Sequence, residues 1–254
     1  MRSHDQDVAQ AFDGQAAQFE SAPVQSDPAA LARLVAFAAL PPDALVLDAG
    51  CGPGLVAEAL LAAGHRVRGV DLSPEMVRRA QARCARFGER AHFEVGSVLA
   101  LPADASHDAA LSRLVVHHVV DPFAFVAAQA ARVRPGGVVV VCDQAGDPDP
   151  GLAWWHQQIE RARDRTHTRS LTPGELADLL VRAGLADLRL VEEAFLLDFD
   201  EWFDRGTPAW PKADVRAAIL AGTARCFAPT LRDDGGISVR NVRVTVRGTV
   251  SRER

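Results

Sequence analysis

The stretch "VLDAGCGPGLVAEAL", residues 46–60, holds three glycines at alternating positions, Gly50, Gly52 and Gly54. An apolar run precedes it and a helical pattern follows, so we expect a strand, a tight turn and a helix. Glycine lets the backbone turn sharply and lets a ligand approach without a Cβ in the way. A turn of this kind indicates a nucleotide-binding site.

The acidic residue in front of the turn distinguishes between nucleotides. The dinucleotide fingerprint has the spacing G-x-G-x-x-G and takes a pyrophosphate at the helix N-terminus. Here the spacing is G-x-G-x-G and Asp48 precedes it, which disfavours a pyrophosphate and favours a cationic group. Asp71, at the end of the next expected strand, can accept both hydroxyls of a ribose. Together they indicate an amino-acid-bearing nucleoside, and S-adenosylmethionine fits this description.

Short apolar runs alternate with helical patterns along the chain, as is typical of a parallel sheet with helices on both faces. The last run alternates strictly enough to be an edge or antiparallel strand with one solvated face. The predicted class is therefore α/β, a Rossmann-like, seven-stranded, mostly parallel sheet with the last strand antiparallel. The expected strands are residues 43–50, 65–73, 91–98, 108–115, 134–143, 186–197 and 237–250.

One domain over residues 1–254 is the economical organisation, because no linker, repeat or low-complexity tract interrupts the chain. Within it we expect an N-terminal region of two helices (1–40), a cofactor-binding core (41–197) and a final strand (236–254). Residues 198–235 do not belong to the strand–helix alternation. They form either an extra helical layer covering the sheet or a lid over the substrate.

Composition argues against several classes of function. The net charge of −5 and the lack of a long basic run argue against a nucleic-acid substrate. The four cysteines lie far apart without a C-x-x-C pair, which argues against a zinc site or a disulfide framework. The polar start of the chain lacks the apolar core of a signal peptide, and no segment reaches the ~18 apolar residues that span a bilayer. We expect a cytoplasmic protein, monomer or homodimer, that acts on a small molecule without a metal, nucleic acid or membrane.

Several ordered motifs resemble those of class I S-adenosylmethionine-dependent methyltransferases. The group in question acts on small molecules and includes ubiquinone/menaquinone-type and natural-product enzymes. The resemblance runs through "VLDAGCGPG", "GVDLSPEMV", "FEVGSVLALP", "DAALSRLVVHHVVDP" and "RVRPGGVVVVCD". Several motifs in order are a stronger signal than a lone glycine-rich turn.

The resemblance implies a set of cofactor-binding residues. The residues of the first turn would surround the methionine part, Asp71 the ribose, and Leu72 with Met76 the adenine. Ser97 stands where the family usually has an acid that accepts the adenine amino group, and Phe19 stands where it often has a tyrosine. The full implied set is Phe19, Asp48, Ala49, Gly50, Cys51, Gly52, Gly54, Asp71, Leu72, Met76, Gly96, Ser97, Val98 and Arg113.

Two histidines are candidate catalytic bases. Methyl transfer is an in-line displacement at a sulfonium, so the protein positions the acceptor and, for a hydroxyl, removes its proton. His117 and His118 follow the fourth expected strand, and Asp143 ends the fifth, where it could orient an imidazole. The alternative is that the histidines cap or pack and that Asp143 caps a helix or turns a loop.

The segment 154–176 is a candidate acceptor-binding region. Its aromatic side chains could stack an aromatic acceptor, and its arginines could hold a carboxylate or phosphate. Alternatively, it is a solvated amphipathic helix whose tryptophan face is core, followed by a helix that Thr172 caps. The candidate residues are Trp154, Trp155, His156, Arg165 and Arg169.

The expected reaction is methylation of a metabolite, with S-adenosylhomocysteine as the product of the cofactor. The candidate base favours O-methylation, while C- or N-methylation remains open. A reaction that uses the bound cofactor without methyl transfer, such as cyclisation, decarboxylation or elimination, is the second hypothesis.

Overall fold

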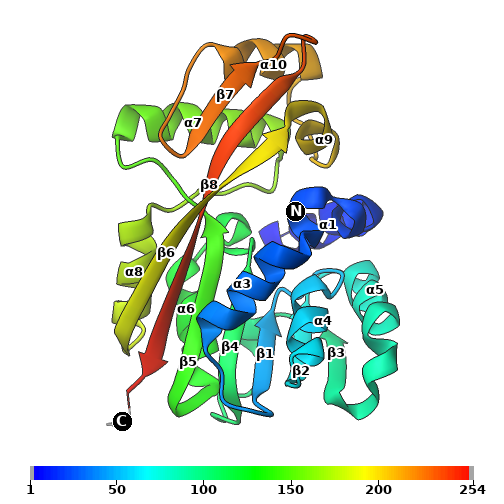
Figure 1. Cartoon of the computed structure of the whole chain (residues 1–254), viewed down its shortest axis with the longest axis vertical. Helices are drawn as coiled ribbons and strands as arrows, with labels where there is room; N and C mark the ends of the chain where they lie inside the picture. The colour runs from blue at the N-terminus through cyan, green and yellow to red at the C-terminus, as the bar shows by residue number, and fades with distance from the viewer. Residues whose placement is uncertain (1–2, 252–254) are drawn as a thin grey trace.

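A computed structural model describes residues 3–251 of the chain. It contains a sheet in the strand order β3-β2-β1-β4-β5-β8-β6, with β7 paired to β8 (Figure 1). The pairs β1–β2, β1–β4, β2–β3 and β4–β5 are parallel, and β8 runs antiparallel to β5, β6 and β7. The strands are β1 Leu45–Ala49, β2 Arg66–Asp71, β3 Ala91–Val95, β4 His107–Arg113, β5 Val133–Gln144, β6 Leu185–Asp198, β7 Phe227–Leu231 and β8 Ile237–Val250.

The predicted α/β class and the antiparallel last strand are confirmed, but the prediction of seven strands is wrong, because the described residues form eight. The additional strand is β7, which lies inside the segment that was expected to be helical. It has only five residues and includes Pro229, and β8 is the strand with which it pairs. A strand this short, with a proline in it, has little sequence signal of its own.

Helices cover both faces of the sheet. The N-terminal region forms three helices rather than two, because Pro23 and Pro28 each begin a new one. Thr172 caps its helix as expected, in a reciprocal capping box with Glu175. The helices are α1 His4–Ser21, α2 Pro23–Ser26, α3 Pro28–Ala38, α4 Leu55–Ala62, α5 Pro74–Cys84, α6 Pro122–Ala131, α7 Pro150–Arg163, α8 Pro173–Arg182, α9 Phe199–Asp204 and α10 Lys212–Leu220, with short 3-10 turns at Ala85–Arg90, Val98–Ala100 and Val116–His118.

The strand side chains divide between two apolar clusters. On β1, Leu47 belongs to a cluster with α6 and α8, whereas Val46 belongs to one with α3, α4 and α5. On β5, Val139 and Val140 divide in the same way. Successive side chains of a strand point to opposite faces, so a run that is apolar at every position is buried on both sides.

Of the two predicted alternatives for the last strand, β8 has the antiparallel arrangement and not the edge position, and it lacks the expected solvated face. It lies between β5 and β6, and all of residues 241–246 are buried. The polar face of its alternating pattern is covered by partners: Arg243 pairs with Glu193 at 3.1 Å and lies over the ring of Phe195. Alternation in this strand therefore reflects paired polar side chains, not exposure to water.

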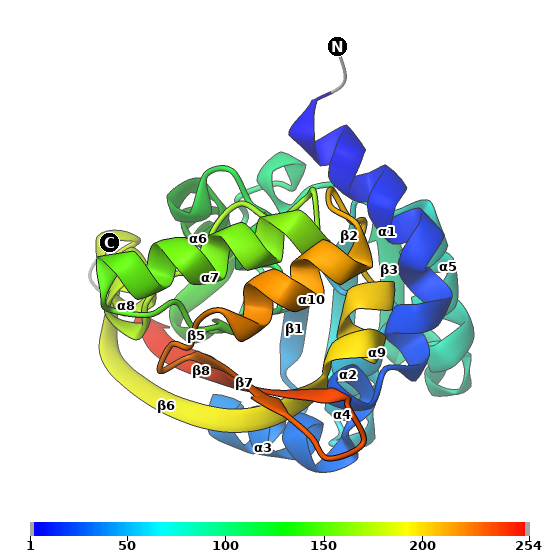
Figure 2. The same ribbon diagram turned by 90° about the horizontal axis from the view of Figure 1, so that it is seen from above.

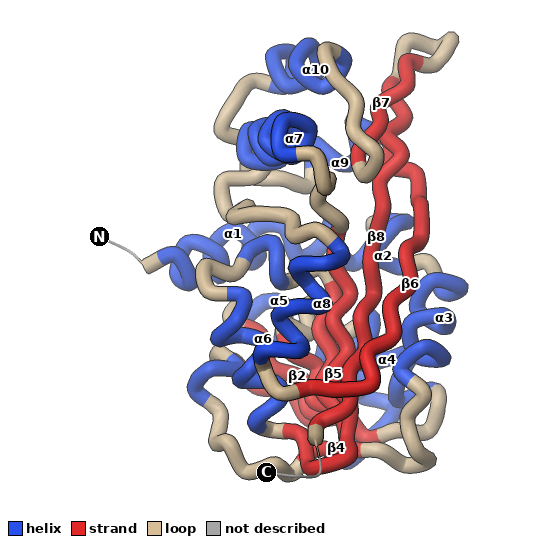
Figure 3. The backbone as a smooth tube through the Cα atoms, turned by 90° about the vertical axis from the view of Figure 1, so that its left-hand side faces the viewer, coloured by secondary structure: helices blue, strands red, loops and turns tan. Residues whose placement is uncertain are grey.

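The upper ends of β6 and β8, together with β7 and helices α7, α9 and α10, form a layer that we call the cap, and it has its own apolar cluster. Both strands have 14 residues and continue past the end of β5, where β7 joins them (Figures 1 and 3). Helices α7 and α10 lie side by side over this extension, next to α9 (Figure 2). The cluster in the cap includes Ile159, Phe199, Trp202, Phe227 and Ile237. Among residues 3–251, no helix has the length and apolarity needed to cross a bilayer.

Replacing Gly54 by alanine is expected to destabilise the protein by about 1–3 kcal/mol. Gly54 has a φ of +81°, and a Cβ at this position would lie 2.9 Å from the Cα of Ala80 in α5. Gly14 provides the matched control: it lies exposed in α1 with open space around it, so Gly14→Ala should stabilise by about 0.5–1 kcal/mol. Urea unfolding of the two variants measures both effects, and an equal effect of the two substitutions would contradict the explanation.

Candidate active site

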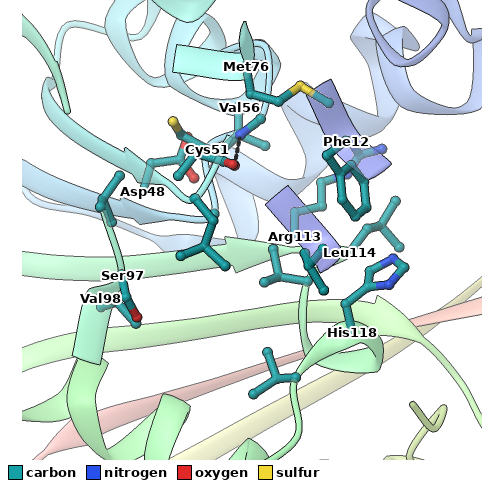
Figure 4. Close-up of a pocket in the computed structure, with 18 of the residues that line it drawn as sticks. Phe12, Asp48, Cys51, Val56, Met76, Ser97, Val98, Arg113, Leu114 and His118 are labelled. Atoms are coloured by element: carbon teal, nitrogen blue, oxygen red, sulfur yellow. Dashed lines mark hydrogen bonds between the residues drawn. The ribbon is translucent and has the colours of Figure 1, made fainter. Parts of the chain in front are cut away.

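A cavity of about 1140 Å³, part of it open to solvent, lies at the carboxyl ends of β1, β2 and β4. The turn after β1, the loop after β2 and helix α1 contribute to its walls (Figure 4). Of the predicted cofactor-binding residues, all but Ala49 and Gly54 line it. Those that do are Phe19, Asp48, Gly50, Cys51, Gly52, Asp71, Leu72, Met76, Gly96, Ser97, Val98 and Arg113.

Backbone hydrogen bonds hold the glycine-rich turn against β2. The amides of Gly50 and Cys51 both donate to the carbonyl of Val70, at 2.8 and 3.0 Å. The amide of Gly52 donates to Oδ2 of Asp71 at 2.8 Å. A Cβ at Gly52 would meet nothing within 4 Å, so the turn presents bare backbone to the cavity.

Asp48 is a buried carboxyl group that forms no ion pair with any described residue. Only 1% of the residue is exposed, and no described residue donates a hydrogen bond to its Oδ2. Burial, and then the charge of Asp71, raise the pKa of Asp48 to about 7. An unpaired carboxylate in a cavity wall is suited to a cationic ligand group.

Asp71 accepts one backbone hydrogen bond on each carboxylate oxygen. Oδ1 receives the amide of Ser73 at 2.9 Å and Oδ2 that of Gly52 at 2.8 Å. Each oxygen keeps acceptor capacity for a further donor. Burial raises the pKa of Asp71, although the two backbone hydrogen bonds oppose this effect.

Helix α1 covers the cavity with aromatic side chains. Phe12 and Phe19 lie 5.2 Å apart between ring centroids, and Phe12 meets the edge of His118 at 5.0 Å (Figure 4). Polar contacts attach the helix to α5: Asp13 accepts hydrogen bonds from the Ser73 hydroxyl and the Glu75 amide. Phe12 was not among the predicted residues, because an aromatic residue on an amphipathic helix does not indicate a site by itself.

Two predicted cofactor residues are hydrogen-bonded within the protein. The hydroxyl of Ser97 accepts the amide of Leu99 at 3.2 Å and so caps a short turn, which leaves its proton free. Arg113 donates to the carbonyls of Val24 and Gln25, both at 3.1 Å. It thereby fixes α2 at the wall of the cavity.

His117 and Asp143 form a hydrogen-bonded pair across the ends of β4 and β5. Nδ1 of His117 lies 2.5 Å from Oδ1 of Asp143, which also accepts the amide of Gln144. Burial alone would lower the pKa of His117, but the charge and hydrogen bond of Asp143 outweigh burial and raise it above its usual 6.5. With Nδ1 donating to the carboxylate, Nε2 carries the free lone pair.

His118 is oriented by a second buried acid, through a hydroxyl. Its Nδ1 lies 2.9 Å from Oγ1 of Thr166, which lies 2.7 Å from Oδ1 of Asp164. Burial raises the pKa of Asp164, but Arg163 and its other partners lower it overall. Asp164 is therefore a carboxylate that accepts the Thr166 proton, so Thr166 accepts Nδ1–H of His118. Burial, and then the charge of His117, lower the pKa of His118 to about 3, so the ring is neutral.

A second cavity of about 560 Å³, part of it open to solvent, lies next to the first, beneath the cap. The two share Phe19, Gln25, Leu114 and His118 in their walls. His117 lines the second cavity only. The remaining wall residues come from α2, β5, α7, the 164–167 loop, β6, α9 and β8, and are Val24, Gln144, Glu160, Arg163, Asp164, His167, Phe195, Leu197, Trp202, Arg205 and Asn241.

None of the predicted acceptor-binding residues is among the described residues that line the two cavities. Trp154 is 65% exposed. Trp155 packs into the cap, and His156 stacks on Phe227 with 4.2 Å between ring centroids. The backbone of Arg165 bonds to Thr207, and the exposed side chain of Arg169 pairs with Glu175.

The phase of α7 explains this placement. One face of the helix carries Trp155, Ile159 and Ala162 into the cap cluster, and another presents Glu160 and Arg163 to the second cavity. The polar run after the helix, "RDRTH" at 163–167, supplies further wall residues. A polar run in a loop is usually solvated, so nothing in the sequence distinguished this one as buried. Between residues 3 and 251, no three His, Cys, Asp or Glu side chains are placed to hold a metal ion together.

A family model described as a methyltransferase domain matches residues 25–190, which is more than half of the chain. The chain belongs to this family. The YcgJ protein of Bacillus subtilis, a solved structure, is 26% identical with a TM-score of 0.79, and the match covers 87% of this chain and 97% of that one. The protein is a class I S-adenosylmethionine-dependent methyltransferase.

Curated relatives of the methyltransferase match over part of their length. The ubiquinone biosynthesis O-methyltransferase of Xanthomonas campestris pv. campestris is 38% identical over 100 residues, which is 39% of this chain and 42% of that protein. The protein of the same name from Cereibacter sphaeroides is 31% identical over 149 residues, 55% of this chain and 59% of that protein. The chain thus spans about half the length of these relatives.

The first cavity of the methyltransferase has the chemistry that S-adenosylmethionine requires. The unpaired Oδ2 of Asp48 suits an ammonium group, and the remaining acceptor capacity of Asp71 suits ribose hydroxyls. The bare backbone at Gly52 allows close approach. Leu72, Met76 and Val98 provide apolar wall for a flat base.

Binding of S-adenosylmethionine near pH 6 is expected to release most of a proton per site. The pKa of Asp48 is about 7 without the cofactor, and an ammonium beside the carboxylate lowers it. Release should therefore fall away above pH 8, where Asp48 is already ionised. Calorimetry in buffers of different ionisation enthalpy measures the proton count.

Asp48→Asn should abolish this release. The control is Asp43→Asn, which removes an exposed carboxylate and should leave the proton count unchanged. Proton uptake by the wild-type protein, or release that persists in Asp48→Asn, would count against the role of Asp48.

Proposed function

We propose that this methyltransferase transfers the methyl group of S-adenosylmethionine to a hydroxyl oxygen of a small molecule held in the second cavity. The carrying observation is that the two cavities adjoin at His118 and that its neighbour His117, which lines the second cavity, is hydrogen-bonded to the buried Asp143. The O-methyltransferase relatives support an acceptor of this kind.

When bound, the cofactor supplies a methyl group already activated on a sulfonium. Asp48 holds its ammonium, and Asp71 holds its ribose hydroxyls. Phe12 and Phe19, both in helix α1, shield the first cavity from water. The protein thereby fixes the position of the methyl group relative to the second cavity, and such positioning contributes several kcal/mol to catalysis.

His117 is the general base. Burial lowers the pKa of His117, but Asp143 raises it overall, which makes the imidazole a stronger base for the proton of the acceptor. Nδ1–H donates to Asp143, so Nε2 receives the proton of the acceptor hydroxyl. His118, with a pKa of about 3, is too weak a base for this task and instead forms part of the wall between the cavities.

Methyl-labelled S-adenosylmethionine tests the proposed reaction directly. We expect label to enter phenols or catechols, with one S-adenosylhomocysteine formed for each methyl transferred. Label in amines or at carbon, in the absence of transfer to oxygen, would replace O-methylation by N- or C-methylation. Turnover of the acceptor without S-adenosylhomocysteine would instead favour a reaction that uses the cofactor without methyl transfer.

Substitution of His117 is expected to lower kcat for a hydroxyl acceptor by roughly 10²- to 10⁴-fold, the usual contribution of a general base.

Activity of the wild type should fall at acid pH with an apparent pKa above 6.5, because His117 loses its lone pair when protonated. Asp143→Asn should move this limb of the kcat/KM profile to lower pH and also reduce kcat. His92→Ala, at an exposed position on β3, is the control. An acid limb that stays in place in Asp143→Asn would exclude the pair as the titrating unit.

A further inference from the structure

Arg205 is a buried cation in the wall of the second cavity. It follows α9, and only 5% of the residue is exposed. Its Nε contacts the backbone carbonyl and Oε1 of Glu201, at 3.4 and 3.3 Å. No described residue accepts a hydrogen bond from its two terminal nitrogens, while its guanidinium lies 5.8 Å from the ring centre of Phe19.

Two other charged residues of this cavity, Arg163 and Asp164, are hydrogen-bonded within the protein. Arg163 donates to the carbonyl of Trp202 at 2.8 Å and to Asp164 at 3.2 Å. Asp164 also accepts hydrogen bonds from Thr166 and Thr207. The remaining carboxylate, Glu160, lies 3.4 Å from Nε2 of His156, although its Oε1 has no hydrogen-bond donor in the described residues.

Arg205 keeps its charge in this setting. Burial, and then the charge of Arg163, lower the pKa of Arg205 to about 10, which still leaves it protonated at neutral pH. Its Nε faces the Glu201 carboxylate, but its terminal nitrogens have no acceptor among the described residues, so a ligand or water has to supply one. The planar fork of a guanidinium matches two oxygens of a carboxylate or phosphate.

The rest of the wall restricts the shape of such a ligand. Apolar side chains form part of the wall of this cavity, among them Leu114, Leu197 and Trp202. An occupant would have an apolar body, with polar groups at Arg205 and at His117.

We propose that the acceptor is an anionic hydroxy compound, whose carboxylate or phosphate is bound by Arg205 while its hydroxyl faces His117. The hydroxyl half rests on the proposed function, whereas anion binding by Arg205 does not. The assignment differs from the expectation for Arg165 and Arg169, which lie outside the cavity. Arg205 would therefore determine which acceptors bind, and His117 which atom reacts.

Binding to the full-length protein saturated with S-adenosylhomocysteine tests anion recognition without any methyl transfer. The probes are benzoate, 3-phenylpropionate and phenyl phosphate, each compared with a neutral counterpart: benzamide, 3-phenylpropionamide and phenol. Calorimetry gives the affinities, and intrinsic tryptophan fluorescence, to which the wall residue Trp202 contributes together with three other tryptophans, gives an independent signal. We expect at least one anion to bind roughly 10- to 100-fold more tightly than its neutral counterpart. The carboxylates and the phosphate separate the two sources of anionic charge.

Arg205→Gln should remove this preference, and Arg205→Lys should retain part of it, because the charge remains while the planar fork is lost. Arg232→Gln, which removes an exposed arginine of the same cap, should behave as wild type. Binding of S-adenosylhomocysteine to each variant reports whether the protein is folded.

Equal binding of anions and neutral counterparts, or no binding of any anion to the wild type, would overturn the proposal. So would a preference that survives in folded Arg205→Gln. Anion binding that depends on Arg205, together with failure of labelled methyl transfer to any hydroxyl, would refute only the proposed O-methylation.

Discussion

The antiparallel pairing of β8 with β5 and β6 is the constraint on which the rest of the active site depends. One half of β8 completes the sheet, where Val244 pairs with Asp143, and the other half carries β7 and the cap. Because both halves belong to one strand, the cap is placed relative to the sheet by a continuous hydrogen-bond ladder. The second cavity is the space between them. His117, the proposed general base, follows β4 and is hydrogen-bonded to Asp143 of β5, while the cap supplies the two arginines of the cavity wall.

Three buried aspartates near the two cavities differ in their hydrogen-bond partners. Asp143 is paired directly with an imidazole, and Asp164 reaches one through a hydroxyl. Asp48 has no donor on Oδ2 among the described residues. The first two are compensated within the protein and serve to fix the tautomers of His117 and His118. Only the third is left for a ligand to compensate.

The sequence was informative where the relevant contacts are local. Two such features are the turn at 50–54 with the acid before it and the helix N-cap at Thr172. Both depend on neighbours within a few residues, so their positions follow from backbone geometry and residue type. The parallel sheet followed from apolar runs of the correct length. The pairing of His117 with Asp143 was accessible too, because ends of adjacent parallel strands lie together.

The remainder depends on contacts that only the folded chain creates. Arg205 and Asp164 reach the cavity through the cap, which exists because β6 and β8 extend beyond β5. The tryptophans and charged residues of α7 led to the prediction that it binds the acceptor. The orientation of the helix about its axis, which the composition does not give, instead places Trp155 against the apolar cluster of the cap. Strand β7 had no signal of its own, since pairing with β8 defines it.

The unpaired oxygen of Asp48 also has a consequence for the fold itself. A carboxyl whose pKa is raised in the folded state contributes most to stability below its unfolded value of 3.8, and this contribution is lost as pH rises through about 7. At neutral pH the protein without its cofactor therefore carries a folding penalty at the site proposed for the cofactor. Relief of that penalty is part of the binding free energy, so affinity for the cofactor is obtained at the expense of stability in its absence.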